Sequence, residues 1–182
     1  MLDQDNIIEK LKYPVGKFKT PAEFSESNRH EAIEALRMLP LNLKAEIEEL
    51  SEEQLDTPYR AGGWSVRQLM HHIADSHMNS FMRFKLALTE DNPTIKPYDQ
   101  DGWVQMEESK ILNPMISIKI LEGIHERLVY ILKRMSEEEF GRTLYHPEMK
   151  KNLSLDAMLA LYGWHSRHHL AHITALKKRK AW

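Results

Sequence analysis

The sequence predicts an all-α protein built as an antiparallel helical bundle with one long loop. Apolar residues recur at helical spacing in the long segments, capping residues precede most of them, and no segment shows the alternation of a half-buried strand. The chain has 182 residues, of which 42% are hydrophobic, so we expect one domain over residues 1–182 with a substantial core. Helices packed on helices are the architecture that follows.

Capping motifs and prolines divide the first half of the chain into helices. A capping box that begins at Thr20, with Pro21 as the first helical residue, predicts a helix over residues 21–38. The other elements that we expect in this half are a further helical turn over residues 40–50, a short helix capped by Ser51, a loop over residues 57–63 and a helix over residues 66–90 capped by Ser65.

The second half is predicted to contain one long loop and two further long helices. Residues 91–113 hold two prolines, a glycine and several Asp and Asn residues, which indicates a loop with a short helical turn near residues 104–108. The elements expected after this loop are a helix over residues 114–135, a short helix at residues 136–139, a loop over residues 141–152 and a helix over residues 155–180 capped by Ser154.

The composition argues against several kinds of partner and site. The net charge is −2 at pH 7, so we expect no binding to nucleic acid or to an anionic membrane, and we interpret the basic run at residues 177–180 as the end of a helix. No segment is apolar enough over a sufficient length to span a bilayer, and the first residues lack the apolar core of a signal peptide. Cysteine is absent, which excludes disulfides and thiolate metal ligands and suits a cytoplasmic protein.

Four of the ten histidines lie between residues 165 and 172, on the last predicted helix. His165 and His169 are four residues apart near the middle of its apolar face, so both imidazoles can reach one metal ion. The alternative is a pair of core histidines that hydrogen bond to carbonyls or water. His168 lies on the flank of this face, and we interpret His172 as a core or supporting histidine.

A third metal ligand has to come from another helix, and the helix capped by Ser65 offers three histidines. His77 lies inside the apolar stripe of this helix, where we expect a structural role, and His71 lies on the far side. His72 begins a polar column at the edge of the stripe, whose other members are Ser76, Asn79 and Arg83. Such a column indicates either the wall of a wet cleft or an ordinary solvated flank.

Four segments carry a family resemblance: GGWSVRQLMHHIADSHMNSFMRFKLALTE, YGWHSRHHLAHI, YPVGKF and IKPYDQDGW. They resemble the DinB-like superfamily, and most closely its YfiT branch, whose members are provisionally described as metal-dependent hydrolases and include bacillithiol transferases. The resemblance implies a four-helix bundle in up-down-down-up order, with a metal held by His72, His165 and His169. It also implies zinc or nickel as the metal, and a cytoplasmic homodimer.

Three neutral imidazoles leave open positions on a divalent metal, where water or a thiol can be activated. Because the chain has no cysteine, a thiol would be a small-molecule cosubstrate; Arg83 could bind its carboxylate and Asn79 could hydrogen bond to it. We therefore expect a metal-dependent enzyme for a small-molecule substrate, with thiol S-transfer slightly favoured over hydrolysis. A non-enzymatic metal-binding stress-response module is the third alternative. The loop residues expected to cover the opening are Tyr98, Asp99, Asp101 and Trp103.

Overall fold

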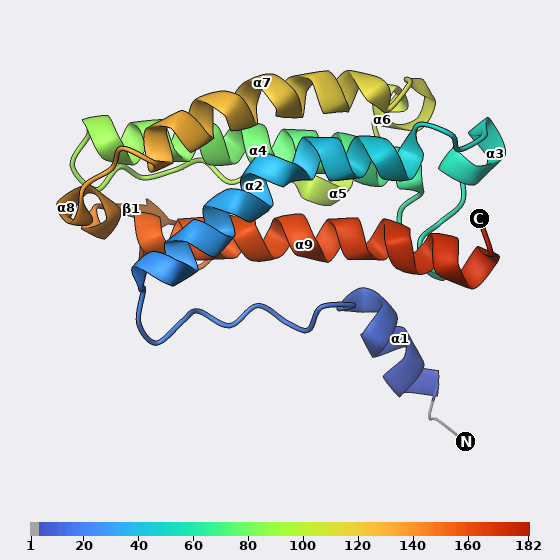
Figure 1. Cartoon of the computed structure of the whole chain (residues 1–182), viewed down its shortest axis with the longest axis horizontal. Coiled ribbons are helices and arrows are strands. Elements are labelled where there is room, and N and C mark those ends of the chain that lie inside the picture. Colours follow the sequence, from blue (N-terminus) through green and yellow to red (C-terminus); the bar gives the residue numbers. More distant parts are fainter. Residues whose placement is uncertain (1–3) are drawn as a thin grey trace.

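Four long helices lie side by side in the computed structural model, which describes residues 4–182 (Figure 1). They are α2 (Glu26–Ile47), α4 (Val66–Thr89), α7 (Met115–Leu132) and α9 (Leu155–Lys180). Figure 1 shows that α2 and α9 run in one direction, and α4 and α7 in the other. The predicted all-α bundle in up-down-down-up order is therefore confirmed.

Serine caps set the starts of three of these helices. Ser25 and Ser65 each open a capping box, in which the serine side chain accepts a hydrogen bond from the backbone N–H three residues later. Ser154 caps α9 in the same way without the reciprocal bond. The caps predicted at Ser65 and Ser154 are confirmed, but the one predicted at Thr20 is wrong, because residues 20–24 contain no helix and α2 begins after Ser25.

The break expected near residue 40 is also wrong, because α2 continues through Pro40 to Ile47. Proline has no N–H, so it donates no hydrogen bond to the carbonyl of Leu36 four residues earlier. Burial of the apolar side chains on both sides of the proline, including Leu36, Leu39 and Leu43, offsets that loss.

Shorter elements occupy the ends of the bundle and the long connection between α4 and α7. They are α1 (Gln4–Lys12), α3 (Glu52–Leu55), α5 (Gln100–Val104), α6 (Glu107–Ile111), α8 (Glu137–Gly141), β1 (Thr143–His146) and β2 (Lys151–Ser154). The single helical turn expected near residues 104–108 is replaced by the two short helices α5 and α6.

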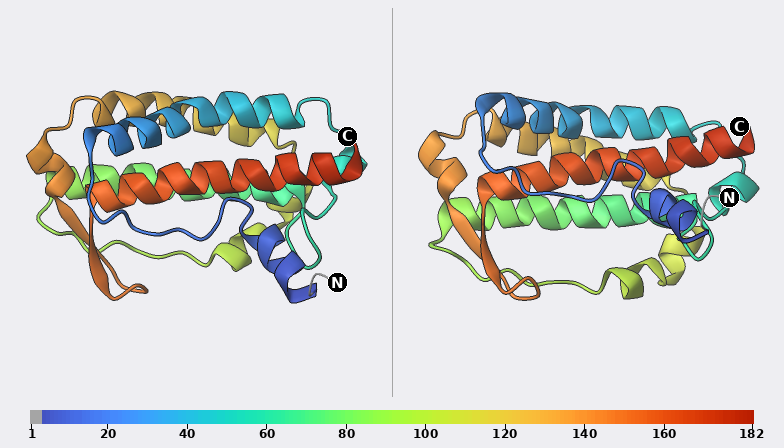
Figure 2. Two further views of the ribbon diagram at one scale, coloured as in Figure 1. Left: turned by 60° about the horizontal axis from the view of Figure 1, so that its bottom comes forward. Right: turned by 90° about the horizontal axis from the view of Figure 1, so that it is seen from below.

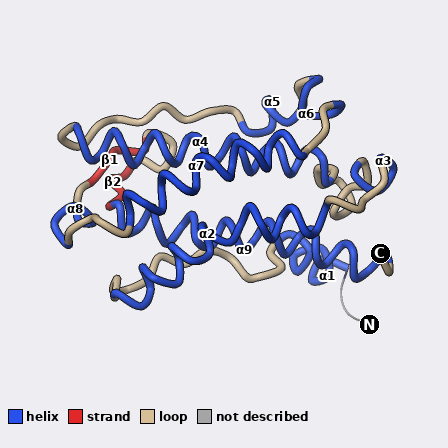
Figure 3. The backbone as a smooth tube through the Cα atoms, turned by 45° about the horizontal axis from the view of Figure 1, so that its top comes forward, coloured by secondary structure: helices blue, strands red, loops and turns tan. Residues whose placement is uncertain are grey.

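The loop expected over residues 141–152 is a β-hairpin. Its two strands pair antiparallel, with Thr143 opposite Ser154 and His146 opposite Lys151, and Figure 3 shows the pair beside α8 in an otherwise helical chain. The strands have four residues each, which is too short for an alternating pattern to be recognised. The backbone N–H of Ile95 donates to the carbonyl of Tyr145 at 3.1 Å, so the connection after α4 is tied to the hairpin.

The N-terminal segment and the connection between α4 and α7 lie along the side of the bundle formed by α4 and α9 (Figure 2). The indole N–H of Trp164 donates to the carbonyl of Gly16 at 3.0 Å and holds the N-terminal segment against α9. None of the helices in the described part of the chain combines the length and the apolar character that crossing a membrane requires.

A layer of buried polar side chains divides the core into two apolar clusters. On α4, His77 and Ser80 are fully buried between the two clusters. At the same level, α7 contributes the buried His125, and α9 contributes the half-buried His165 and the buried Ser166. Because buried polar groups need hydrogen-bond partners or a ligand, this layer is a candidate for the functional site.

Candidate metal centre

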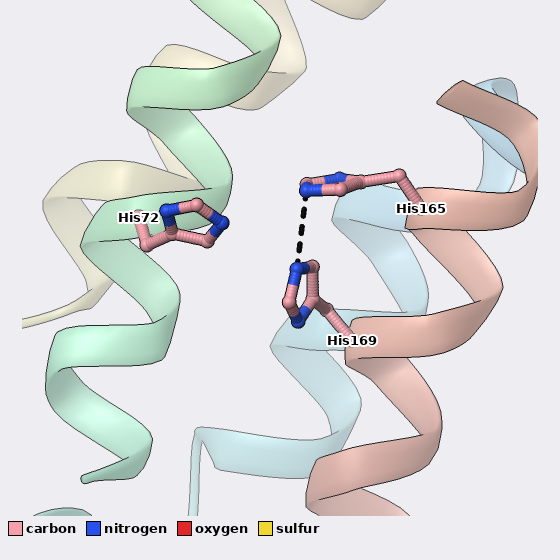
Figure 4. Close-up of side chains that lie close together, drawn as sticks. All are labelled: His72, His165 and His169. Carbon is pink, nitrogen blue, oxygen red and sulfur yellow. Dashed lines mark hydrogen bonds between the residues drawn. The ribbon is translucent and has the colours of Figure 1, made fainter. Parts of the chain in front are cut away.

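Three histidines converge at this layer, one from α4 and two from α9 (Figure 4). The Nε2 atoms of His165 and His169 are 3.1 Å apart, and one ring nitrogen of each of the three side chains, that of His72 included, lies within 4.8 Å of the others. Two imidazole nitrogens on one tetrahedral zinc ion lie about 3.4 Å apart, given zinc–nitrogen bonds of about 2.0–2.1 Å. The spacing of the α9 pair therefore already fits a shared ion.

Burial keeps these imidazoles neutral near pH 7. It lowers the pKa of His72 to about 4, and it lowers the pKa values of His165 and His169 well below the ordinary value, with neighbouring histidines adding to the effect. Only a neutral imidazole has a lone pair to offer a metal. The donor set therefore fits a divalent transition metal such as zinc.

The three histidines line a cavity of about 500 Å³. Residues from the N-terminal segment, from the loop before α4 and from α5 complete its wall, among them Lys12, Tyr13, Tyr59, Gln100 and Asp101. Trp64 packs against His72 with ring centroids 4.6 Å apart, which holds the imidazole from the side. Three nitrogen ligands beside an open cavity are typical of a catalytic metal site and not of a closed structural one.

A smaller cavity of about 200 Å³ adjoins the first, because His165 and Gln100 line both. Arg83 lines this smaller cavity and is only 9% exposed, and among residues 6–182 no carboxylate lies within ion-pair distance of it. Its Nη1 donates to the hydroxyl of Tyr162 at 3.4 Å. A buried guanidinium with unused donors is suited to an anionic group of a ligand.

Other polar side chains of the smaller cavity come from the loop before α5 and from the hairpin. The hydroxyl of Tyr98 is buried without a hydrogen-bond partner among residues 6–182, and burial raises its pKa. His146 is buried beside Arg83, whose charge adds to burial in lowering the pKa of this histidine, and Glu148 lines the exposed rim. Arg83 and Tyr98 therefore both offer hydrogen-bond donors to a group bound in this cavity.

The structure does not bring every predicted residue to the site. Asn79 lines neither cavity, and its amide donates to the carbonyl of Asp75 on its own helix at 2.9 Å. His71 turns away from His72: its ring nitrogens lie 2.8 Å from the hydroxyl of Ser117 and 3.3 Å from the carbonyl of Leu112. A role for Asn79 at the metal therefore has no geometric support here.

The loop that was expected to cover the opening does so in part. Tyr98 lines the smaller cavity, and Asp101 lines the larger one. Asp99 instead caps α5 by accepting a hydrogen bond from the backbone of Gly102 at 2.9 Å. Trp103 packs on Tyr98 with ring centroids 4.5 Å apart, so it helps to hold the Tyr98 side chain in place.

Three more buried histidines extend from His165 and His169 through short distances between ring nitrogens. His77 Nε2 is 3.1 Å from His165 Nδ1, and His77 Nδ1 is 2.9 Å from His125 Nε2. His172 Nδ1 is 3.3 Å from His169 Nδ1. The buried positions predicted for His77 and His172 are confirmed, whereas sequence reasoning missed His125, although its place within the apolar stripe of α7 was a signal of burial.

His168 is buried on the flank of α9. Its ring stacks on Trp164 with centroids 4.4 Å apart, and its Nδ1 has no partner among residues 6–182. Together with His169 and His172 it forms a second group of three close imidazoles. Because both groups include His169, the two groups cannot each hold a metal ion at the same time through this side chain.

A family model described as the DinB superfamily matches residues 35–173. The chain belongs to the DinB superfamily. YfiT of Bacillus subtilis (strain 168), provisionally named a metal-dependent hydrolase, is 45% identical over 172 residues, which cover 94% of this chain and 97% of that protein. A relative from Bacillus cereus (strain 03BB102) with the same provisional name is 47% identical over 176 residues, which cover 96% of this chain and all of that protein (100%).

The solved structure of Bacillus subtilis YfiT superposes on this member of the superfamily with a TM-score of 0.92. The match has 44% sequence identity and covers 95% of this chain and 99% of that one. That structure is described as a four-helix bundle of unusual topology, in agreement with the helix order found here. The relatives are thus named for metal-dependent chemistry, and this chain has a histidine cluster that could hold a metal.

Proposed function

We propose that this protein is a hydrolase that uses one divalent metal ion, held by His72, His165 and His169, to cleave a small anionic substrate. The observation that carries the proposal is the convergence of three neutral imidazoles on an open cavity. The names of the relatives support hydrolysis better than the thiol transfer that the sequence slightly favoured. We propose zinc as the metal, with nickel as the second candidate, because three imidazoles and an open position suit both.

One set of side chains binds the metal, and another set binds the substrate. When bound, such an ion acts as a Lewis acid that makes water or a thiol nucleophilic near neutral pH. The three imidazoles approach from α4 and α9 and leave the cavity side open to substrate. Arg83 offers charge-assisted hydrogen bonds to an anionic group, and Tyr98 offers a further donor. Because the two cavities meet at His165, a substrate anchored at Arg83 would extend toward the metal.

Thiol S-transfer is the second candidate. The chain has no cysteine, so a thiol nucleophile would be a separate small molecule, and the buried charge of Arg83 suits a thiol that carries a carboxylate. Both reactions use the same metal centre and anion site. They differ only in whether water or the thiol attacks.

Elemental analysis tests the metal centre. The purified wild-type protein should contain one divalent ion per chain, and His169→Ala should lose it. His168→Ala is the matched control, because this neighbouring histidine is equally buried, at 7% exposure each, but lies outside the proposed ligand set. Full metal content in the His169→Ala protein would refute the assignment.

The reaction is tested with the zinc-loaded protein on two substrate panels. One panel contains esters and amides that carry a carboxylate or phosphate, and the other contains an electrophile with several low-molecular-weight thiols. Hydrolysis without any thiol supports the proposed function. Conjugation that requires a thiol supports the second candidate instead, and no turnover in either panel would refute both in favour of a metal-binding module.

A further inference from the structure

His165, His77 and His125 form a row in which successive imidazoles lie within hydrogen-bond distance of each other. A backbone carbonyl at the end of this row sets the direction of its hydrogen bonds. The carbonyl oxygen of Leu36 lies 2.6 Å from Nδ1 of His125. A carbonyl can only accept, so His125 carries its proton on Nδ1. Pro40, four residues further along α2, has no N–H to donate to this carbonyl, so the bond from His125 takes the place of the missing helical one.

Once this proton is placed, the other protons of the row follow. A neutral imidazole has one N–H and one lone pair. Nε2 of His125 therefore accepts from Nδ1–H of His77 at 2.9 Å, and Nε2 of His77 accepts from Nδ1–H of His165 at 3.1 Å. His165 is left with its lone pair on Nε2, the atom that faces His169.

The tautomer of His169 is set in the same way by a different backbone carbonyl. The carbonyl of Lys12, the last residue of α1, lies 3.2 Å from Nε2 of His172. Carbonyls in the last turn of a helix have no partner within the helix, so this one is free to accept. His172 donates from Nε2, and its Nδ1 accepts from Nδ1–H of His169 at 3.3 Å. The lone pair of His169 is therefore also on Nε2.

The contact drawn between His165 and His169 in Figure 4 thus joins two lone pairs that are 3.1 Å apart. Two lone pairs repel each other unless a cation lies within reach of both. We propose that His125, acting through His77, and His172 are positioning residues that hold His165 and His169 in the Nδ1–H tautomer, so that both offer Nε2 to the same metal ion.

This arrangement agrees with a general property of metal-binding histidines, whose second ring nitrogen donates to a fixed acceptor. The acceptor here is a further histidine in each case, and each row ends at a carbonyl that its own helix leaves unpaired. The proposal rests on the proposed metal centre but not on whether water or a thiol attacks.

Nitrogen NMR of the isotope-labelled full-length protein tests the tautomers directly. Couplings between the ring nitrogens and the carbon-bound ring protons show which nitrogen carries the proton. In the metal-free protein we expect protonated Nδ1 and bare Nε2 in His165, His169, His77 and His125. A proton on Nε2 of either His165 or His169 would overturn the proposal.

Variants at His125 test whether the row controls metal binding. His125→Leu removes the anchor, whereas His125→Gln keeps one donor and one acceptor in its amide. His71→Leu is the matched control, because His71 is buried next to His72 with two hydrogen bonds but belongs to neither row. All three are compared with the wild type by competition for zinc against a chromophoric chelator.

We expect His125→Leu to bind zinc about 10- to 100-fold more weakly than the wild type, the usual effect of losing a residue that orients a ligand. His125→Gln and His71→Leu should stay close to the wild-type affinity. Equal losses in His125→Leu and His71→Leu would refute the proposal. If His125→Leu does not fold, the wild-type tautomers decide alone, and a wild-type protein that binds no zinc would refute the metal centre separately.

Discussion

Replacing Gly163 by alanine should destabilise the bundle, whereas the same change at Gly123 should stabilise it. A Cβ added to Gly163 on α9 would lie 2.8 Å from Cβ and 2.9 Å from Cα of Ala32 on α2. These atoms belong to a helix and cannot rotate away, so one of the two helices would have to shift. At Gly123 on α7, an added Cβ meets nothing within 4 Å.

The size of the effect follows from two contributions. Alanine in a helix interior is more favourable than glycine by about 1 kcal/mol, which applies to both sites. Overpacking costs about 1–3 kcal/mol and applies only at Gly163. Since the first contribution cancels between the two variants, the Gly123→Ala protein should have the larger free energy of unfolding by about 1–3 kcal/mol. In a chain of this length each kcal/mol corresponds to about 2–4 °C in Tm.

Urea denaturation followed by circular dichroism measures this difference between the two variants. Equal stabilisation by both substitutions would refute the close approach of α2 and α9 at Gly163. Zinc affinity gives a second readout, because Gly163 lies two residues before His165 in the sequence. A shift of α9 should weaken zinc binding in Gly163→Ala and leave it unchanged in Gly123→Ala.

Four further predictions concern the site and the assembly. Arg83→Ala should raise the KM for an anionic substrate or thiol roughly 10- to 150-fold with metal content unchanged, as expected for a lost charge-assisted bond of about 1.5–3 kcal/mol, and unaltered steady-state kinetics would count against the anion site. His77→Ala should lower the free energy of unfolding by roughly 1–3 kcal/mol and, because it also breaks the row that orients His165, weaken zinc binding about 10- to 100-fold as His125→Leu does; wild-type stability in denaturation would contradict its buried role. Burial lowers the pKa values of His72 and His125 from 6.5 to about 4, so between these pH values these two side chains alone bind two protons in the unfolded chain that they do not bind in the native state, and Asp75, whose pKa burial raises to about 6, offsets one of them. The metal-free protein should therefore lose about 1.4 kcal/mol or more of stability per pH unit as the pH falls through this window, and urea midpoints that do not change with pH would argue against these buried neutral histidines. We also propose a homodimer, which a monomeric mass in light scattering at micromolar concentration would disprove.

The helices could be predicted where their signals are local. The caps at Ser65 and Ser154 each combine a hydroxyl with the start of an apolar period, those at Ser51 and Ser136 each precede a short helix, and the structure has all four. The box at Thr20 has the same letters but no such support, because residues 20–24 bury no side chain and the amphipathic face begins only after Ser25. Capping letters therefore predict a helix start only where the following turn packs against something.

The candidate site could be predicted only in its local part. The pair His165 and His169 follows from helical spacing, whereas choosing His72 over its neighbours required the family resemblance. The carbonyls that end the two histidine rows could not be predicted, because they depend on how α1 and α2 pack against α7 and α9. A backbone acceptor leaves no signal of its own in a sequence.

Pro40 has a consequence for any attempt to make this protein more heat-resistant. Proline inside a helix is an obvious target, since alanine is more favourable there by about 3 kcal/mol on propensity scales. Alanine at position 40 would, however, supply a backbone N–H that competes with His125 for the carbonyl of Leu36. Thermostability and metal retention would then be selected in opposite directions at this position. A proline at position 40 should therefore accompany a histidine at position 125 among related proteins, and lineages that lose one should tend to lose the other.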